Sequence, residues 1–283
     1  MQTLTFGSIT VDALVDGQLN LPFGRAFRGF DAAHFARYGG IDGNTIAAQL
    51  TTFVIRAAGR IILVDTGQGA EMGEMATAGF SGSCGLLPGA LADAGIAPES
   101  IDFVVLTHLH GDHIGWNVTS GDEPRVMFPR ARYLVSRTEW AHWSATADAS
   151  VERCVRPLEA AGQLELVADD HAVVPGVKLL PTPGHTPGHV SVLVFEAGTG
   201  GVITGDAVHH PAEFEALDMS PRFDLDPARS MASRKELAER VEAEGLVVMG
   251  GHFPSPTAGN IVRVGQHRAW RWLGALGAES LET

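Results

Sequence analysis

The densest group of chemically capable side chains lies in residues 107–113, which read Thr-His-Leu-His-Gly-Asp-His. This segment places four groups of metal-ligand type within six residues: His108, His110, Asp112 and His113. Three more such groups occur downstream, each directly after a glycine: His185, Asp206 and His252. Borderline divalent metals bind imidazole nitrogen and carboxylate oxygen. The set is large enough for two neighbouring ions if one carboxylate bridges them, so the sequence predicts a two-metal hydrolase.

The residues around the motif explain how its side chains can face one site. Apolar residues dominate positions 101–106, which predicts a buried strand that leads into the motif. At the strand end, His108 and His110 are two residues apart and point to the same side. Gly111 lets the chain turn sharply, and Asp112 and His113 follow on the turn or on the first turn of a helix. A cluster of purely structural histidines is the alternative, and it would leave the downstream groups unexplained.

Length and composition favour one acidic globular domain over residues 1–283. The chain has 283 residues with 45% hydrophobic content, and no linker or low-complexity tract divides it. Its net charge of −13 disfavours nucleic acids and anionic membranes as partners. We therefore expect a small-molecule substrate that either is neutral or approaches a locally positive metal centre.

Cysteine usage and the N-terminus bear on the compartment. Cys84 and Cys154 form no CxxC motif and are expected to be free thiols in a reducing compartment. The sequence shows no signal-peptide pattern and no apolar run of membrane-spanning length. A cytoplasmic location is the expectation.

Each candidate ligand follows a predicted strand at a glycine turn. Strands are predicted within residues 3–16, 45–65, 101–106, 177–180, 190–195, 202–204 and 246–249. Helices are predicted over 86–94, from a capping box at 136–139, and over 226–244. In a layered α/β protein, strand ends of this kind meet at one edge of the sheets. A site assembled from distant segments is therefore expected there.

Residues 17–44 differ from the rest because aromatic side chains alternate with glycine and arginine. This segment predicts a loop or short helix that covers something apolar, either a substrate pocket or a partner subunit in a homodimer. An ordinary packed connection is the alternative. The predicted pocket residues are Phe23, Phe27 and Phe30, together with Trp116 just beyond the metal motif, for which simple packing is the alternative.

These residues together resemble the metallo-β-lactamase superfamily over roughly residues 45–255. The signature HxHxDH, the three downstream ligands and the strand-end Asp65-Thr66-Gly67 carry the resemblance. It implies an α/β fold, an αββα sandwich of two mixed β-sheets with helices on the outside. It also implies a first metal on His108, His110 and His185, a second on Asp112, His113 and His252, and Asp206 as the bridge. Two divalent ions are expected, Zn²⁺ first, although the same donors accept Mn, Co or Fe.

Within the superfamily, residues 205–259 are most similar to methyl-parathion hydrolases and related lactonases. The pieces that carry this similarity are Gly205-Asp206-Ala207-Val208-His209, Arg222-Phe223-Asp224-Leu225-Asp226-Pro227 and Gly251-His252-Phe253-Pro254. Acyl-homoserine lactonases commonly carry a tyrosine where His209 and His210 stand here. This difference argues against an acyl-homoserine substrate but leaves the hydrolytic core intact.

The predicted function is a dinuclear metal-dependent hydrolase in which a metal-bridging hydroxide attacks a lactone or related ester. A phosphotriester hydrolase is the main alternative. An iron-dependent redox protein, a β-lactamase and a non-catalytic binding module remain as further alternatives. The resemblance implies catalytic roles for Asp112, which could orient the hydroxide, and for His209, which could donate to a substrate oxygen. Asp65 is predicted to support a ligand imidazole or, alternatively, to cap a turn.

Overall fold

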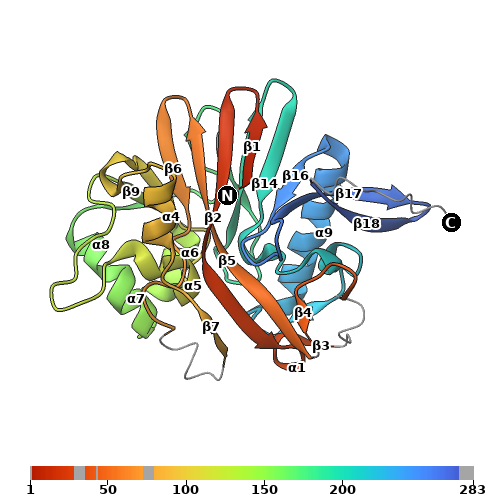
Figure 1. Ribbon diagram of the computed structural model, residues 1–283, viewed down its shortest axis with the longest axis horizontal. Helices are drawn as coiled ribbons and strands as arrows, with labels where there is room; N and C mark the ends of the chain where they lie inside the picture. Colours follow the sequence, from red (N-terminus) through yellow and green to blue (C-terminus); the bar gives the residue numbers. More distant parts are fainter. Residues whose placement is uncertain (1, 29–35, 43, 73–79, 274–283) are drawn as a thin grey trace.

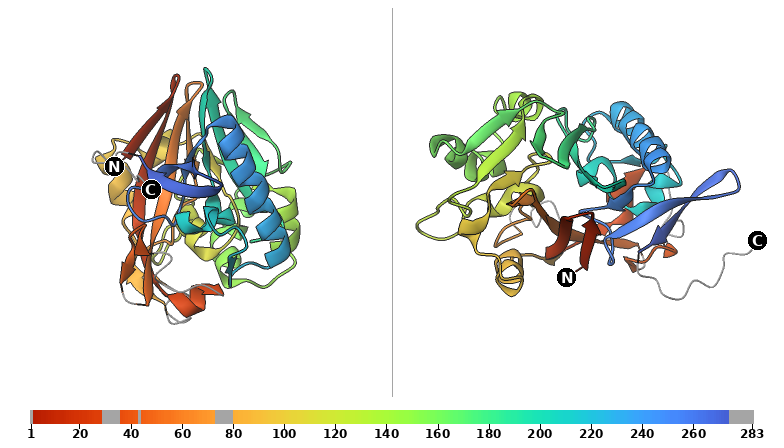
Figure 2. Two further views of the ribbon diagram at one scale, coloured as in Figure 1. Left: turned by 90° about the vertical axis from the view of Figure 1, so that its right-hand side faces the viewer. Right: turned by 90° about the horizontal axis from the view of Figure 1, so that it is seen from above.

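Two β-sheets lie face to face in the computed structural model, with helices on their outer sides (Figures 1 and 2). The structure describes residues 2–28, 36–42, 44–72 and 80–273. Both sheets contain parallel and antiparallel strand pairs. The predicted αββα sandwich is therefore confirmed.

The first sheet is built mainly from the N-terminal half of the chain. Its strand order is β1-β2-β5-β6-β8-β9-β10, and the short strands β4 and β7 pair with β5 and β2. The strands are β1 (Gln2–Phe6), β2 (Ile9–Pro22), β4 (Ile41–Asp42), β5 (Thr45–Ala57), β6 (Arg60–Val64), β7 (Ser81–Ser83), β8 (Phe103–Val105), β9 (Arg132–Ser136) and β10 (Leu164–Val167). Strands β6, β8, β9 and β10 run parallel, so the ends of β6 and β8 open toward the same edge.

The second sheet is built from the C-terminal half, in the order β11-β12-β13-β14-β16-β17-β18. Its strands are β11 (Ala172–Val174), β12 (Val177–Pro181), β13 (Val190–Glu196), β14 (Thr199–Ile203), β16 (Val247–Met249), β17 (Ala258–Val264) and β18 (His267–Trp272). Strands β14 and β16 are parallel neighbours, which brings the turns that follow them close together. A separate pair, β3 (Phe27–Arg28) with β15 (Ser220–Pro221), ties the N-terminal segment to the second half.

The helices flank the two sheets on opposite sides of the molecule (Figure 1). The helices beside the first sheet are α4 (Leu87–Asp93), α5 (Gly111–Ile114), α6 (Arg137–Trp143), α7 (Ala149–Cys154) and α8 (Arg156–Ala160). The long helix α9 (Pro227–Glu244) packs on the second sheet, and α1 (Phe23–Ala26) is a single turn after β2. As predicted, α9 starts after the Asp226 cap and ends at Gly245, whose φ of 64° is left-handed.

Three apolar layers hold the sandwich together. Phe53 and Val64 of the first sheet pack between the sheets against Val192 and Met249 of the second. A second cluster joins the first sheet to its helices, and a third joins the second sheet to α9. Apolar burial on both faces fixes the strands rigidly, so the turns at their ends start from fixed positions.

The path of β2 differs from the prediction, which ended this strand region at residue 16. The register between β2 and β5 shifts at Val15 and Gly17, and the strand then continues to Pro22. A Cβ on Gly17 would lie 2.0 Å from the carbonyl oxygen of Ser83, so β7 can approach only at a glycine. A bulge of this kind bends a strand without ending it. The long arm of β2 and β5 is visible at the bottom of Figure 1.

The predicted capping box at the start of α6 is only half present. The side chain of Ser136 accepts a hydrogen bond from Glu139 N, as predicted. The carboxylate of Glu139, however, accepts hydrogen bonds from Trp143 of the same helix and from Leu109 and Gly188 of two other segments. The sequence could not show the contacts with Leu109 and Gly188, because these residues lie far from Glu139 along the chain.

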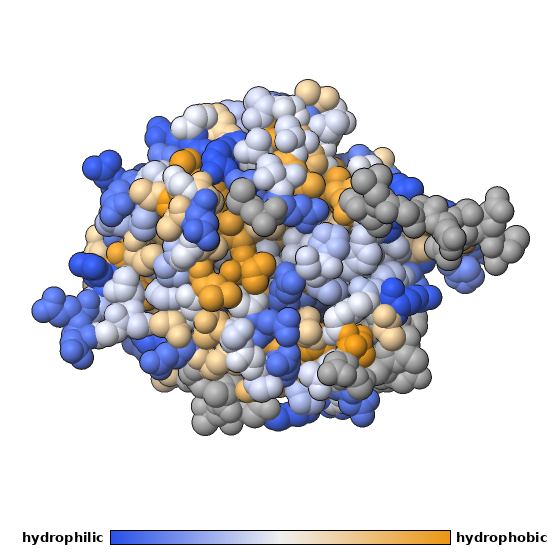
Figure 3. All heavy atoms as spheres, viewed as in Figure 1, coloured by the Kyte–Doolittle hydropathy of each residue, from blue (hydrophilic) through white to orange (hydrophobic). Residues whose placement is uncertain are grey.

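The face of the molecule drawn in Figure 3 shows mostly hydrophilic and neutral residues with smaller hydrophobic patches. No helix of the described residues is both long and apolar enough to cross a membrane. The two cysteines are free, as predicted. Phe30, one of the predicted pocket residues, lies outside the described residues.

Candidate metal centre and active site

The predicted ligands come together at one edge of the sandwich. His108 and His110 follow β8, Asp112 and His113 lie on α5, and the others follow β12, β14 and β16. Their ligand atoms form two groups, each with all its atoms within 4.8 Å of one another. The first group is His108, His110, His185 and Asp206, and the second is Asp112, His113 and His252.

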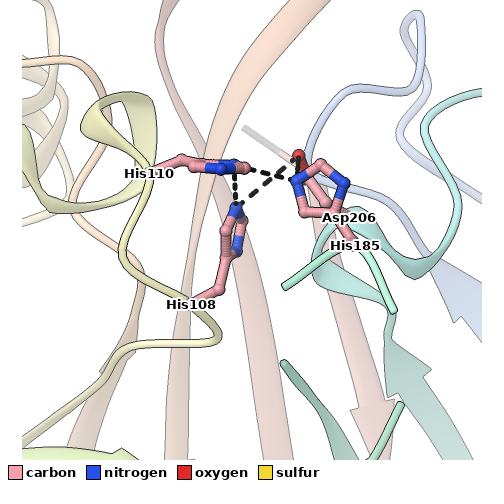
Figure 4. A group of neighbouring side chains, drawn as sticks. All are labelled: His108, His110, His185 and Asp206. Carbon is pink, nitrogen blue, oxygen red and sulfur yellow. Dashed lines mark hydrogen bonds and ion pairs between the residues drawn. The ribbon is translucent and has the colours of Figure 1, made fainter. Parts of the chain in front are cut away.

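The first group has its imidazole nitrogens pointing at one another (Figure 4). His110 Nδ1 lies 3.1 Å from His108 Nε2 and 2.9 Å from His185 Nε2. These separations approach the edge of about 3.4 Å expected for a tetrahedron with Zn–N bonds of about 2.1 Å. A divalent cation between the nitrogens would satisfy their converging lone pairs.

Asp206 lies between the two groups, and each of its carboxylate oxygens faces one of them. Its Oδ2 is 3.2 Å from His185 Nε2 and 3.8 Å from His108 Nε2. Its Oδ1 is 3.2 Å from both His113 Nε2 and His252 Nε2. One carboxylate thus presents one oxygen to each ligand group, which is the geometry that a bridging ligand requires.

Asp65 supports the second group from behind. One of its oxygens lies 2.8 Å from His113 Nδ1, and the same oxygen accepts a hydrogen bond from Thr107 Oγ1. Its other oxygen accepts from Thr107 N at 2.8 Å. Asp65 has a left-handed φ of 59°, a conformation that aspartate tolerates better than most residues. The turn therefore aims both carboxylate oxygens at the motif and fixes the imidazole of His113.

Two further ligands are held by polar partners that the sequence did not single out. His185 Nδ1 lies 3.0 Å from Asp224 Oδ1, and His252 Nδ1 lies 2.8 Å from the carbonyl oxygen of Gln49. The buried guanidinium of Arg234, on α9, lies 3.7 Å from the other oxygen of Asp224. Asp224 lies in Arg222–Pro227, one of the segments that carried the similarity to methyl-parathion hydrolases and related lactonases. That similarity is the sequence signal that could have pointed to Asp224.

The pKa values of the histidines in the two groups shift in different directions. Burial, reinforced by neighbouring histidines, lowers the pKa of His108 well below its usual value and that of His110 to about 3. Burial also opposes charge on His185, but Asp206 and Asp224 outweigh it and raise its pKa to about 9. The pKa of His113 and of His252 is raised in the same way, with Asp206 as the main opposing cause.

The carboxylate between the two groups, that of Asp206, is itself held as an anion. Burial raises the pKa of Asp206, but the surrounding histidines, with His252 first, bring it well below its usual value. A buried anion among converging imidazoles is the donor set that a pair of divalent ions requires. The residues of this centre therefore fit two divalent ions.

A cavity of about 340 Å³ opens beside the two groups. Its apolar lining comes from Leu19, Leu21, Phe27, Ile46, Ala48, Phe80 and Phe223. Its polar lining comes from Gln68, His110, Asp112, Asp148, Ser150, His185, Asp206, His209, His210 and His252, with Gly111 between them. Among the described residues that line it, none is lysine or arginine. The cavity therefore combines an apolar wall with a side that carries predicted metal ligands.

The predicted pocket residues separate into different positions. Phe27 lines the cavity. Phe23 does not line it, and its ring packs against that of Phe27 with 5.9 Å between the ring centroids. Trp116 is buried in the core between the first sheet and its helices, and its Nε1 donates to Asp16 Oδ1 at 2.9 Å. Trp116 is thus placed away from the cavity wall because its indole N–H is drawn to that buried carboxylate.

His209 lies at the boundary between the metal groups and the cavity wall. Its Nε2 is 3.2 Å from Asp206 Oδ2, and its ring stacks on that of His252 at 6.0 Å. Phe27 meets it edge-on at 6.4 Å. A group in this position can reach both the bridging carboxylate and a molecule in the cavity.

A fold of two mixed sheets with two such ligand groups at its edge defines a class of metal-binding α/β sandwich proteins. A family model of the metallo-beta-lactamase superfamily matches residues 47–252. The chain belongs to this superfamily, as its ligand motif predicted.

Similar proteins narrow the comparison further. An N-acyl homoserine lactonase of Bacillus thuringiensis is 32% identical over 163 residues, which are 57% of this chain and 60% of the relative. The matched region thus spans less than two thirds of that relative's length.

Solved structures extend the similarity over more of the chain. The crystal structure of the hydrolase AbOPH, in the beta lactamase superfamily, has a TM-score of 0.81 at 23% identity and covers 95% of both chains. This likeness concerns the fold. An N-acyl homoserine lactone hydrolase, solved with N-hexanoyl-L-homoserine at its catalytic metal centre, has a TM-score of 0.69 at 25% identity. The alignment covers 86% of this chain and 92% of that structure.

Proposed function

We propose that the protein is a dinuclear metal-dependent hydrolase that opens lactones or related esters. The observation that carries the proposal is Asp206, whose two oxygens face two separate ligand groups beside a largely apolar cavity. Two bound ions, for which Zn²⁺ is the first candidate, would lower the pKa of a water and polarise the carbonyl of the substrate. The first ion would be held by His108, His110 and His185, the second by Asp112, His113 and His252, with Asp206 shared.

Asp206 and Asp112, two of the carboxylates that line the cavity, have separate roles in this proposal. Asp206 keeps its negative charge because its pKa is depressed, so it can hold both groups together. Asp112 Oδ2 lies 3.5 Å from His252 Nε2, and Asp112 also lines the cavity. We assign Asp112 the task of accepting a hydrogen bond from the attacking water and thereby orienting it.

His209 is assigned to the substrate. It lines the cavity next to Asp206 and lies between Phe27 and His252. From there its ring N–H can donate to the carbonyl oxygen or to the leaving oxygen of the lactone. The tyrosine commonly found in acyl-homoserine lactonases offers a donor at a similar point in the sequence.

The substrate class follows from the lining and from the relatives. Among the described residues that line the cavity, no lysine or arginine is present to bind an anionic substrate, and the apolar wall can hold an acyl chain. The relatives named above act on N-acyl homoserine lactones. We therefore place neutral lactones with an N-acyl chain first, despite the histidine in place of the tyrosine.

A phosphotriesterase activity is the second candidate. Its support is the aromatic lining, because Phe27, Phe80 and Phe223 all face the cavity. Aromatic rings of this kind suit an aryl leaving group. The metal centre proposed above would serve either reaction.

A turnover panel decides between these activities. The metal content of the protein as purified would be measured first, and the metal-loaded protein would then be assayed on N-acyl homoserine lactones, aryl esters, phosphotriesters and β-lactams. We expect two ions for each chain and the highest kcat/KM on a lactone. A preference for phosphotriesters selects the second candidate, one bound iron supports redox chemistry, and the absence of bound metal overturns both hydrolytic proposals.

A further inference from the structure

A fully buried carboxylate, that of Glu139, lies behind the metal centre at the start of α6. Its Oε1 accepts hydrogen bonds from Leu109 N at 3.1 Å and from Trp143 Nε1 at 2.7 Å. Its Oε2 accepts one from Gly188 N at 2.9 Å. A buried carboxylate is costly unless it is fully hydrogen-bonded, and three N–H donors from three segments meet that requirement.

The donors on Oε1 belong to the part of the chain that carries the first two ligands. Leu109 is the residue between His108 and His110, so its N–H fixes the backbone at the point where both imidazoles leave it. The ring of Trp143 lies edge-on to His110 with 5.5 Å between ring centroids. Glu139 therefore holds both the backbone of this segment and the side chain that flanks His110.

The donor on Oε2 belongs to the segment that carries the third ligand. Gly188 lies three residues after His185, and a Cβ at Gly188 would stand 2.0 Å from Glu139 N. The next residue, His189, accepts a hydrogen bond from Asp206 N at its Nε2, at 2.9 Å. Its Nδ1 lies 2.9 Å from Thr182 Oγ1. The contact at Gly188 thus extends through His189 to the backbone of the bridging aspartate.

We propose that Glu139 is a positioning residue for the first metal ion, because its one carboxylate fastens the segment of His108 and His110 to that of His185, which in turn reaches the backbone of Asp206 through His189. This inference rests on the two-ion function proposed above. The second group depends on other partners, since His113 is held by Asp65 and His252 by the carbonyl of Gln49. The effect of Glu139 is therefore unequal between the two ions.

The substitution that tests this role is Glu139→Gln. It keeps the size of the side chain but replaces one acceptor oxygen with an NH₂ group, which would face an N–H donor. Either Gly188 N or the pair Leu109 N and Trp143 Nε1 then loses its partner, and one ligand segment is released. Loss of an outer partner of this kind typically costs about 10–100-fold in metal affinity.

Asp16 offers a matched control because it has the same kinds of donor. Its carboxylate is also fully buried and accepts from Gln68 N, Leu87 N and Trp116 Nε1, each at 2.9 Å. Of these donors, Trp116 lies three residues after His113 of the second group, and none lies near a first-group ligand in the sequence. Asp16→Asn should therefore lower stability in a similar way while leaving the affinity of the first ion nearly unchanged.

The measurement is a Co²⁺ titration of the metal-depleted protein, followed by visible absorption and by the stoichiometry of bound metal. His185→Ala and His252→Ala, each lacking one ligand of one group, assign the absorption bands to the first and second ion. In Glu139→Gln we expect the first ion to bind about 10-fold more weakly or worse, with a smaller change for the second. If Glu139→Gln does not fold, Trp143→Phe removes one donor to Glu139. In that variant the first ion should again be weakened more than the second, but by a smaller factor.

The outcomes separate this inference from the proposed function. Binding of both ions as in the wild type, or equal weakening of both, would overturn the role of Glu139. A similar loss of the first ion in Asp16→Asn would also overturn it, because any buried carboxylate would then have the same effect. Failure of the wild-type protein to bind two Co²⁺ ions would instead refute the two-ion function.

Discussion

The metal centre and the wall of the adjoining cavity are built in different ways. The ligands sit on short turns that follow strands, and three of them are fixed by a second polar group, such as Asp65 or Asp224. The cavity wall comes largely from the arm of β2 and β5, where Leu19 lies opposite Ala48 and Leu21 opposite Ile46. The centre thus depends on directed hydrogen bonds, whereas the wall depends on apolar shape.

Substitutions in the two regions should therefore change different measured quantities. A change in the metal centre should alter how much metal is bound and, through it, the rate of every reaction. A change in the wall should alter which substrate is preferred while the metal stays in place. Each substitution below either sharpens this division or breaks it.

The largest effect is expected at Asp206, on which both ligand groups converge. Asp206→Asn keeps the shape of the side chain but replaces one oxygen with NH₂ and removes the negative charge between the groups. We expect metal content to fall toward one ion and turnover to fall by about 10²–10³-fold or more on all substrates. Metal analysis and kcat on a small ester provide the measurement. Full activity with two ions retained would contradict the bridging role.

The metal centre could be predicted from sequence because its determinants are local. Each ligand follows an apolar strand at a turn, so residue type, strand end and glycine occur together within a few positions. The partners of the ligands are harder to predict. Glu139 was interpreted as half of a capping box, although its carboxylate contacts segments around residues 109 and 188. Contacts of this kind depend on how distant segments pack.

The cavity wall could be predicted only in part. Phe27 was expected to contact the substrate and lines the cavity, but Phe80 and Phe223 were not singled out for it. The apolar positions at 19, 21, 46 and 48 were not connected, because residues 17–44 were predicted as a loop or short helix, whereas β2 continues past a bulge at Gly17. The register across β2 and β5 places these side chains on one face, and single residues do not reveal that register.

His209 lies where the two regions meet, so its substitution tests the boundary between them. His209→Phe retains a ring beside Phe27 but removes the nitrogen that lies 3.2 Å from Asp206. We expect kcat on a lactone to fall by about 100-fold while two ions remain bound. His209→Tyr supplies a hydroxyl donor and should recover part of this loss. Loss of one ion from His209→Phe would show instead that His209 belongs to the metal centre.

The pH dependence of metal binding should separate the two ligand groups. In the metal-free protein, the first group contains two histidines of lowered pKa, His108 and His110, and one, His185, whose pKa is about 9. Both histidines of the second group, His113 and His252, have a raised pKa. Because a metal must displace these protons, affinity should rise with pH by about tenfold per unit for each proton released. The second ion should therefore show the steeper rise.

The stability of the metal-free protein should change in the opposite direction. The folded-state pKa of His185, about 9, lies above the ordinary value of 6.5. Its contribution to stability is thus complete below pH 6.5 and is lost as the pH rises through about 9. Thermal unfolding of the metal-free protein between pH 6 and 9 measures this loss of stability, and the same scan with buffered Zn²⁺ measures how metal binding changes with pH.

The prediction about metal binding has its own contrary outcome. If the affinities of the two ions rise equally steeply with pH, the two groups do not differ in the protons that they release.

The smallest effect is expected in the wall, where Phe27 and Phe23 form a matched pair. Both rings are buried in one cluster, but only Phe27 lines the cavity. Phe27→Ala should raise KM for long-chain lactones by about 10-fold relative to short-chain ones. It should leave two ions bound and kcat on a small ester nearly unchanged.

Phe23→Ala is the control for this prediction. Removing either buried ring should destabilise the protein by about 3–5 kcal/mol, so a lower Tm alone does not distinguish the two variants. Chain-length preference does, because only the ring of Phe27 borders the cavity where an acyl chain would lie. If both variants lower Tm and neither changes the ratio of kcat/KM between long and short lactones, then Phe27 is ordinary core packing. The substrate would in that case be selected by the aliphatic face of β2 and β5 or by Phe80 and Phe223, and the same pair of measurements on those positions would locate it.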